Sequence, residues 1–269
     1  MKKHRVLYVS QEITPYLPES EMANISRYLP QGIQERGREI RTFMPRFGLV
    51  NERRNQLHEV IRLSGMNLII NDTDHPLIIK VASIQAARMQ VYFIDNDDYF
   101  HRKATLSDEK GVEFADNDER AIFFARGVLE TVRKLRWTPD LVHCHGWFTA
   151  LIPLYLKKVL YDDPLFSHTK VVCSLYQNGF KTPLSQSFKE KLLMPGIKPE
   201  DVDVLSVPDH VHVSQLAIAN SDAVILGSKV LDPEIDRYLK NSGKPCLNYQ
   251  DPDNYVEAYS DFYQDVLGV

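Results

Sequence analysis

Apolar residues along the chain alternate between short continuous runs, typical of buried strands, and stretches with helical spacing. Residues 5–10 (RVLYVS) and residues 39–44 are strand-like runs rich in β-branched and apolar side chains. The stretch between them begins after Ser20, a good N-cap, and ends before Gly37, a good C-terminal cap. Its apolar residues recur at helical spacing: Met22, Ile25, Leu29 and Ile33. The pattern predicts a strand, helix, strand unit.

Residues 57–105 have a different pattern. Short β-rich runs separated by Asn and Asp turns follow one another here: VIRLS, NLIIN, LIIKVASIQ and MQVYFID. We therefore expect a β-rich insertion, or the mixed edge of a larger sheet.

The remaining chain returns to the alternation of helix and strand. Asp116 and Glu119 resemble a capping box that opens a helix ending near Leu135. We then expect strands at 140–144, 170–175, 223–226 and 244–248, with helices at 148–159, 184–193, 211–219, 233–239 and 252–267. This rhythm predicts one α/β domain over residues 1–269, with a doubly wound, mostly parallel, Rossmann-like sheet.

Aromatic residues are concentrated in the final predicted helix. Four of them have helical spacing: Tyr255, Tyr259, Phe262 and Tyr263. We interpret them as the face that docks this helix onto the sheet, and a surface for a partner protein is the alternative.

Composition and charge exclude several classes of function. With 43% hydrophobic and 25% charged residues, the chain is typical of a soluble globular protein. A net charge of -4 argues against a nucleic-acid partner, which requires a surplus of Lys and Arg on one face. No apolar run is long enough for a membrane span, and the run that ends at Ser10 is too short for a signal peptide.

The chain has three cysteines, Cys144, Cys173 and Cys246, without paired spacing. We interpret them as buried free thiols in a reducing compartment, and we expect a cytoplasmic protein.

The loops that follow the predicted parallel strands should meet at one edge of the sheet, where open α/β sheets bind ligands. These loops are residues 11–19, 145–147 and 176–181. Four aromatic side chains could offer flat faces to a sugar ring: Tyr16, Tyr99, Trp147 and Tyr176. The alternative is that they are core residues with a satisfied polar tip.

The first of these loops lacks the features of a phosphate site. It contains Pro18, Glu19, Ser20 and Glu21, where a nucleotide-binding turn would carry glycines, free backbone N–H groups and preferably a lysine. Carboxylates at a helix N-terminus suit the helix dipole but repel phosphate. A Rossmann dinucleotide site is therefore excluded, and we expect no cofactor.

Two further groups of polar residues have simple structural explanations. His143 and His145 can point to one face of a strand end, as in a metal site, but no third ligand is evident, so we expect no metal. For Asp116, Asn117, Glu119 and Arg120 we expect a helix cap and an internal ion pair. We also find no nucleophile elbow, and we assign no catalytic residue.

Several long motifs of the chain resemble one family. RVLYVSQEITPY, TFMPRFG, VYFIDNDDYFHR, FADNDERAIFFARGVLETV and WTPDLVHCHGWFTALIPLYLK are similar, in this order, to the N-terminal domain of bacterial glycogen and starch synthases. KVVCSLYQNGF and SDAVILGSKVLDPEI extend the resemblance. It implies half of a glycosyltransferase B fold, and a metal-independent retaining transfer of glucose from ADP-glucose to an α-1,4-glucan.

The resemblance fails at the positions that hold the sugar nucleotide. The family's lysine, threonine, glycine, glycine, leucine motif falls on Pro18 to Met22. The aspartate of its histidine, aspartate, tryptophan motif falls on Gly146, and a later donor-contacting histidine falls on Tyr176. The chain is also too short for the family's second, nucleotide-binding domain.

We therefore interpret the chain as the acceptor-side domain of a glycogen or starch synthase-like protein that is not catalytic alone and binds α-glucan or a partner synthase. Half of a split glucosyltransferase, completed by a separate chain with the C-terminal domain, is the alternative. An unrelated small-molecule binder is a third hypothesis. The candidate substrate-binding residues are Glu12, Thr14, Tyr16, Tyr99, His145, Trp147, Tyr176, Gln177 and Asn178.

Overall fold

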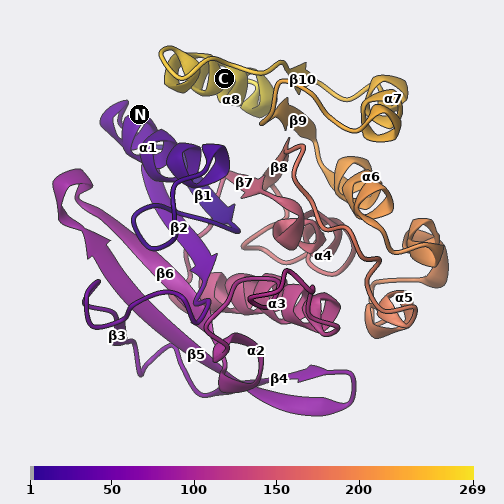
Figure 1. The fold of residues 1–269 in the computed structure, drawn as a ribbon. Helices are drawn as coiled ribbons and strands as arrows, with labels where there is room; N and C mark the ends of the chain where they lie inside the picture. Colours follow the sequence, from indigo (N-terminus) through magenta and orange to yellow (C-terminus); the bar gives the residue numbers. More distant parts are fainter. Residues whose placement is uncertain (1–2) are drawn as a thin grey trace.

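The computed structural model describes residues 3–269 and contains one large twisted sheet with helices on both faces (Figure 1). Its strands follow the order β10-β9-β8-β7-β1-β2-β6-β5-β3, and β4 pairs with β5. The strands are β1 (Arg5–Ser10), β2 (Glu39–Pro45), β3 (His58–Glu59), β4 (Met66–Ile70), β5 (Thr73–Ile84), β6 (Met89–Asp95), β7 (Leu141–His145), β8 (Lys170–Leu175), β9 (Ala223–Leu226) and β10 (Cys246–Leu247). The helices are α1 (Glu21–Glu35), α2 (Asp97–Phe100), α3 (Asn117–Leu135), α4 (Leu151–Lys158), α5 (Phe188–Lys191), α6 (His210–Asn220), α7 (Pro233–Ser242) and α8 (Tyr255–Leu267).

The strands from β10 to β6 are parallel, which confirms the predicted α/β, mostly parallel sheet. Strands β3, β4 and β5 add an antiparallel edge, so the predicted β-rich region at this edge is confirmed. The expected strand VIRLS is wrong. Residues 60–64 form turns, because the amides of Leu63 and Ser64 bond back to the carbonyl of Val60 at 2.9 and 3.1 Å.

Two apolar layers hold the helices against the sheet. Alternate residues of β1 point to opposite faces, so Leu7 and Val9 belong to the layer under α3, α4 and α6, whereas Val6 and Tyr8 belong to the layer under α1 and α8. All four of these side chains are buried. The chain therefore buries both faces of its central strands, as parallel sheets require.

Helix α1 has the caps that the sequence predicts. The Ser20 hydroxyl accepts a hydrogen bond from the amide of Ala23 at 3.0 Å. Gly37 adopts a φ of 87°, where glycine is favoured, and its amide bonds to the carbonyl of Gln34 at 2.9 Å. These caps fix the position of the helix N-terminus next to the end of β1.

The predicted capping box of α3 is wrong. Asp116 occupies the N-cap position but makes no side-chain cap hydrogen bond. It pairs instead with Arg102 at 2.6 Å. Helix α5 is also shorter than the expected helix over 184–193, because the amide of Leu184 bonds to the carbonyl of Pro208 and not to a helical partner.

Helix α8 lies across α1 and the central strands (Figure 1). Tyr259 and Tyr263 are buried in the same layer as Tyr8. The two helices approach closely at Gly32, where an added Cβ would lie 2.5 Å from Cγ1 of Val256. A small residue on α1 thus allows α8 to dock.

The three cysteines are free, as predicted, but only two of them are buried. Cys144 and Cys173 are register partners on β7 and β8. Cys246 is exposed, contrary to our expectation, because β10 is a two-residue strand at the sheet edge. Within residues 3–269, none of the helices has the length and apolar character needed to cross a bilayer.

Candidate functional site

The carboxyl ends of β1, β8 and β9 meet the N-terminus of α1 and enclose a pocket of about 160 Å³. We call it the strand-end pocket. It is lined by Gln11, Glu12, Ser20, Glu21, Met22, Tyr176, Asn178 and Ser228. The structure therefore brings together three of the predicted binding residues, Glu12, Tyr176 and Asn178.

Carboxylates and serine hydroxyls form one wall of this pocket. Ser20 donates a hydrogen bond of 2.7 Å to Glu12. Ser228 donates one of 3.3 Å to Glu21 and accepts one of 3.2 Å from the backbone amide of Gln177. Among the described residues that line the pocket there is no Lys or Arg. Hydroxyl, amide and carboxylate groups can hydrogen-bond sugar hydroxyls, whereas the two carboxylates repel a phosphate.

A buried tyrosine lines the pocket and is hydrogen-bonded to a buried histidine behind it. The hydroxyl oxygen of Tyr176 lies 2.9 Å from Nδ1 of His145, which is fully buried. Burial lowers the pKa of His145 to about 3 and raises the pKa of Tyr176 well above its usual value. Both groups are therefore neutral near pH 7. His145 acts on the site through Tyr176 and does not itself line the pocket.

The ring of Tyr176 is held in place by Gly227 at the end of β9. A Cβ at this glycine would lie 2.6 Å from the tyrosine ring, so the close approach requires glycine. Tyr176 is only 6% exposed, and its ring lies mainly against the protein. The loop after β9 thus positions Tyr176 in the pocket.

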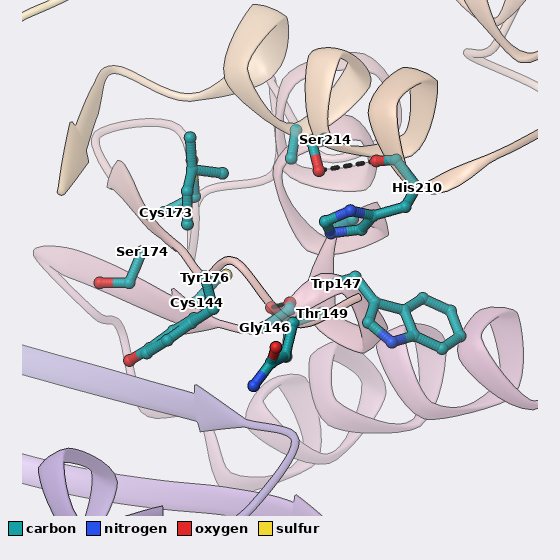
Figure 2. Close-up of a pocket in the computed structure, with 13 residues that line it drawn as sticks. Cys144, Gly146, Trp147, Thr149, Cys173, Ser174, Tyr176, His210 and Ser214 are labelled. Atoms are coloured by element: carbon teal, nitrogen blue, oxygen red, sulfur yellow. Dashed lines mark hydrogen bonds between the residues drawn. The ribbon is translucent and has the colours of Figure 1, made fainter. Parts of the chain in front are cut away.

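Trp147 lies in the wall of a small internal cavity that Tyr176 also lines (Figure 2). Its ring packs on Phe180 and Phe148 with centroid distances of 4.5 and 5.3 Å. The cavity, also lined by His210 and Ser214, holds about 20 Å³. That volume admits a water molecule but not a sugar ring.

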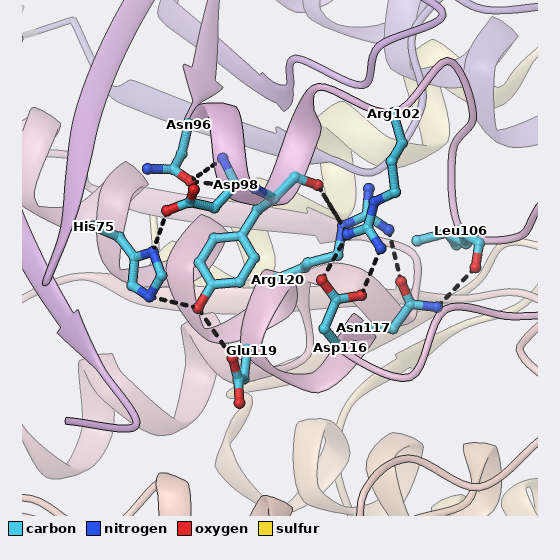
Figure 3. Close-up of polar contacts among 10 residues, drawn as sticks. His75, Asn96, Asp98, Arg102, Leu106, Asp116, Asn117, Glu119 and Arg120 are labelled. Carbon is cyan, nitrogen blue, oxygen red and sulfur yellow. Dashed lines mark hydrogen bonds and ion pairs between the residues drawn. The ribbon is translucent and has the colours of Figure 1, made fainter. Parts of the chain in front are cut away.

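Two predicted tyrosines lie away from the strand-end pocket. Tyr16 is buried with its ring edge-on to Phe93 at 4.9 Å, and burial raises its pKa to about 12. Tyr99 contacts His75 at 3.0 Å and donates to Glu119 at 3.1 Å, inside a polar network beside α2 (Figure 3). Tyr99 is thus a core residue with a satisfied polar tip, as the alternative explanation describes. Tyr16 is also a core residue, but its buried hydroxyl has no hydrogen-bond partner among residues 3–269.

The other polar residues of α3 belong to the same network (Figure 3). Arg120 is fully buried and donates to the carbonyl of Tyr99 at 2.8 Å and to Asn117 at 2.6 Å. Asp116 pairs with Arg102. Glu119 pairs with Lys191 at 2.7 Å. The two acids thus form ion pairs with residues outside the predicted group, and not the expected pair within it.

The two remaining candidates are loop residues with different environments. Thr14 is half-buried, and its amide bonds to the carbonyl of Ala23 at 3.3 Å. Gln177 is exposed beside Asn178, and its backbone rather than its side chain contacts Ser228. Neither side chain lines the strand-end pocket.

Both ring nitrogens of His143 have partners, which leaves none for a metal. Nδ1 lies 2.6 Å from the hydroxyl of Tyr263, and Nε2 lies 2.7 Å from that of Ser174. The ring centroid lies 3.9 Å from that of His145, and the two rings are tilted by 40°. Within residues 3–269, no group of three or more potential ligands is arranged to hold a metal ion.

Sequence reasoning missed Glu21, Ser228, Ser20 and Gln11 as pocket residues. Ser228 could have been found, because it follows strand β9 and the crevice rule applies to that strand too. Met22, at the start of α1, also lines the pocket and was missed. Gln11 lies in the loop 11–19, from which we chose only Glu12, Thr14 and Tyr16. Ser20 and Glu21 were considered only for the helix cap and for phosphate binding.

Comparison with known proteins identifies relatives over most of the chain. Residues 5–243 match the family model for the starch synthase catalytic domain. The chain is similar to the glycogen synthase of Chlorobium luteolum, with 35% identity over 87% of this chain and 47% of that protein. It is 32% identical to the glycogen synthase of Chlorobaculum tepidum over 91% of this chain and 51% of that protein. The chain thus spans about half the length of these curated relatives.

A solved structure has a similar fold. It is the catalytic domain of starch synthase IV from Arabidopsis thaliana bound to ADP and acarbose, with a TM-score of 0.72 and 16% identity over 93% of this chain and 52% of that chain.

Proposed function

This chain belongs to the starch and glycogen synthase family, and we propose that it is a noncatalytic member whose strand-end pocket binds α-glucan. Catalysis by this chain alone would require residues that bind the diphosphate of a sugar nucleotide. In this function Glu12, Tyr176 and Asn178 bind hydroxyl groups of the glucan and not phosphate groups.

The observation that carries this proposal is the pair of carboxylates at the N-terminus of α1. Glu12 accepts from Ser20, and Glu21 accepts from Ser228. A helix N-terminus attracts an anion when its backbone amides lack other hydrogen-bond partners and no negative charge lies nearby. Here the first-turn amide of Ala23 is already bonded to Ser20, and two acidic groups line the approach.

Glucose transfer is the direct test of the noncatalytic part. The purified chain is incubated with ADP-glucose and glycogen, and incorporation of glucose is measured against a heat-denatured sample. The full-length glycogen synthase of Chlorobium luteolum is the positive control. We expect no incorporation above the denatured sample, and turnover by the chain alone would overturn this part of the proposal.

Glucan binding is tested separately by affinity electrophoresis in native gels with and without glycogen. We expect the chain to migrate more slowly in the glycogen gel. Equal mobility in both gels would contradict glucan binding and favour a protein partner.

The share of each relative that this chain matches supports a second candidate function. The chain matches about half of each curated glycogen synthase, so it could act as one half of a split glucosyltransferase. Mixing it with the C-terminal half of the Chlorobium luteolum enzyme tests this candidate. Glucose transfer only in the mixture would support it, and an inactive mixture would contradict it.

We also propose a reducing, cytoplasmic location. The register partners Cys144 and Cys173 are neighbours on adjacent strands and remain unpaired. Cell fractionation checks this, and recovery outside the cytoplasm would contradict it.

A further inference from the structure

A larger pocket lies beside the strand-end pocket, and the comparison with known proteins assigns no function to it. Its volume is about 620 Å³, within the usual range of small-molecule sites. We call it the tyrosine pocket. It is lined by Glu19, Glu21, Asn24, Ile25, Tyr28, Tyr249, Gln250, Pro252 and Tyr255.

Two segments far apart in the sequence build the tyrosine pocket. One wall is the first two turns of α1, and the other is the segment 249–255 that leads into α8. This second segment lies outside residues 5–243, which the family model matches. Helix α8 is docked through buried Tyr259 and the close approach of Val256 to Gly32, so the second wall is anchored to the first.

The tyrosine pocket and the strand-end pocket are neighbours, because Glu21 lines both. Tyr249 is hydrogen-bonded to Glu21, which raises the pKa of Tyr249. Ser228 donates to the same carboxylate. A ligand that extends past Glu21 can therefore touch both pockets.

The charges around the pocket select against anionic ligands. Glu19 and Glu21 line it and repel an anion. The chain's own cations already lie over two of the rings, with Arg27 at 4.9 Å from the Tyr28 ring and Lys229 at 5.3 Å from the Tyr249 ring. These side chains occupy the cation–π positions on the two rings that a cationic ligand would otherwise use.

A neutral ligand with apolar faces and many hydroxyls matches what remains. Tyr28 is 53% exposed and offers a flat surface. The side chains of Asn24 and Gln250 supply amide donors and acceptors, and the carboxylate of Glu19 supplies an acceptor. Carbohydrate rings have these complementary properties.

We propose that the tyrosine pocket is a second carbohydrate site that holds a neutral α-glucan beyond the strand-end pocket. This inference rests on the proposed glucan binding. Because Glu21 lines both pockets, one glucan chain can occupy both of them. A longer chain that makes both contacts at once then binds with higher affinity. Maltoheptaose should therefore bind more tightly than maltose.

Substitution of the tyrosines tests the inference. Tyr28→Ala and Tyr249→Ala should each raise the dissociation constant for glycogen, measured by affinity electrophoresis, at least about fivefold, as expected for a truncated aromatic contact. Tyr161→Ala is the matched control, because Tyr161 is 63% exposed and lines neither pocket. Tyr28→Trp keeps a ring and should retain binding, and circular dichroism checks that each variant folds.

The outcomes separate this inference from the proposed function. If wild type is retarded by glycogen, and Tyr28→Ala and Tyr249→Ala are retarded equally, the second site is overturned and the proposed function stands. Asn178→Ala, in the strand-end pocket, should then be the variant that loses affinity. If wild type is not retarded at all, both proposals are overturned. Loss of affinity in Tyr161→Ala as well would also overturn the second site.

Discussion

The hydroxyl of Ser20 donates a hydrogen bond of 2.7 Å to the carboxylate of Glu12, across the end of β1 and the start of α1. The same hydroxyl accepts from the amide of Ala23 at 3.0 Å. One serine thus caps the helix and holds a carboxylate beside its N-terminus. The amide of Ala23 and the carboxylate of Glu12 are thus both bonded to the same hydroxyl.

Removal of this hydroxyl should destabilise the fold. Ser20→Ala loses the cap and leaves Glu12 without this donor, so we expect the free energy of unfolding to fall by about 1–2 kcal/mol. Urea unfolding at pH 7 measures it. Ser187→Ala is the matched control, since Ser187 is also an N-cap residue but makes no side-chain cap hydrogen bond. An equal loss in both variants would contradict the role of the Ser20 cap.

Stability should fall in acid because two histidines are buried in their neutral form. Burial lowers the pKa of His145 to about 3 and the pKa of His143 well below its usual value. Between the unfolded value near 6.5 and the folded value, the unfolded chain binds more protons. Each histidine therefore lowers the free energy of unfolding by up to about 1.4 kcal/mol per pH unit as the pH falls below 6.5.

Urea unfolding from pH 7 to pH 5 checks this dependence. His145→Asn should reduce the slope of stability against pH, whatever its effect on stability at pH 7. His168→Gln, at an exposed histidine, is the control and should keep the wild-type slope. A slope that His145→Asn leaves unchanged would show that His145 does not carry the effect.

Reversal of one charge at the helix N-terminus should improve nucleotide binding. Glu21→Lys changes the charge that faces the strand-end pocket by two units, and at about 4 Å each unit is worth about 1 kcal/mol in water. We expect the affinity for ADP to rise by roughly 30-fold, measured by calorimetry at low salt.

The gain from Glu21→Lys should shrink at high salt, because screening weakens exposed charge interactions. Glu200→Lys makes the same change of net charge at an exposed position that does not line this pocket. Equal ADP affinities of the two variants would argue against a local electrostatic barrier.

A side chain at Gly227 should displace Tyr176. The added Cβ of Gly227→Ala would lie 2.6 Å from the ring, so we expect a loss of about 1–3 kcal/mol in the free energy of unfolding. Tyr176→Ala removes the ring, and the double variant should then show a strongly reduced effect of the alanine at position 227. A double-mutant cycle by urea unfolding measures this coupling. Additive losses would mean that the two residues do not constrain each other.

Much of the fold could be predicted because its signals are local. The strands 5–10, 170–175 and 223–226 have the predicted bounds, and Ser20 and Gly37 cap α1 as expected. Failures occur where long-range contacts outweigh local preference. Asp116 is a favoured residue type at the N-cap position, but its carboxylate forms an ion pair with Arg102 and makes no cap hydrogen bond.

The candidate site was predictable only in part. The rule that loops after parallel strands converge brings Glu12, Tyr176 and Asn178 together correctly. The same reasoning did not separate an aromatic side chain at the pocket from one in the core. Tyr16 and Tyr99 carry the same chemistry as Tyr176, yet packing places them away from the pocket.

The sequence by itself determined the alternation of strands and helices, the caps of α1, the family, and a first loop without lysine or glycine. Only the tertiary structure decided that Glu21 and Ser228 share one pocket, and that the segment 249–255 forms a second one against α1. The physical reason is that hydrophobic periodicity reports which side of an element is buried, whereas strand order and helix docking decide which distant residues meet.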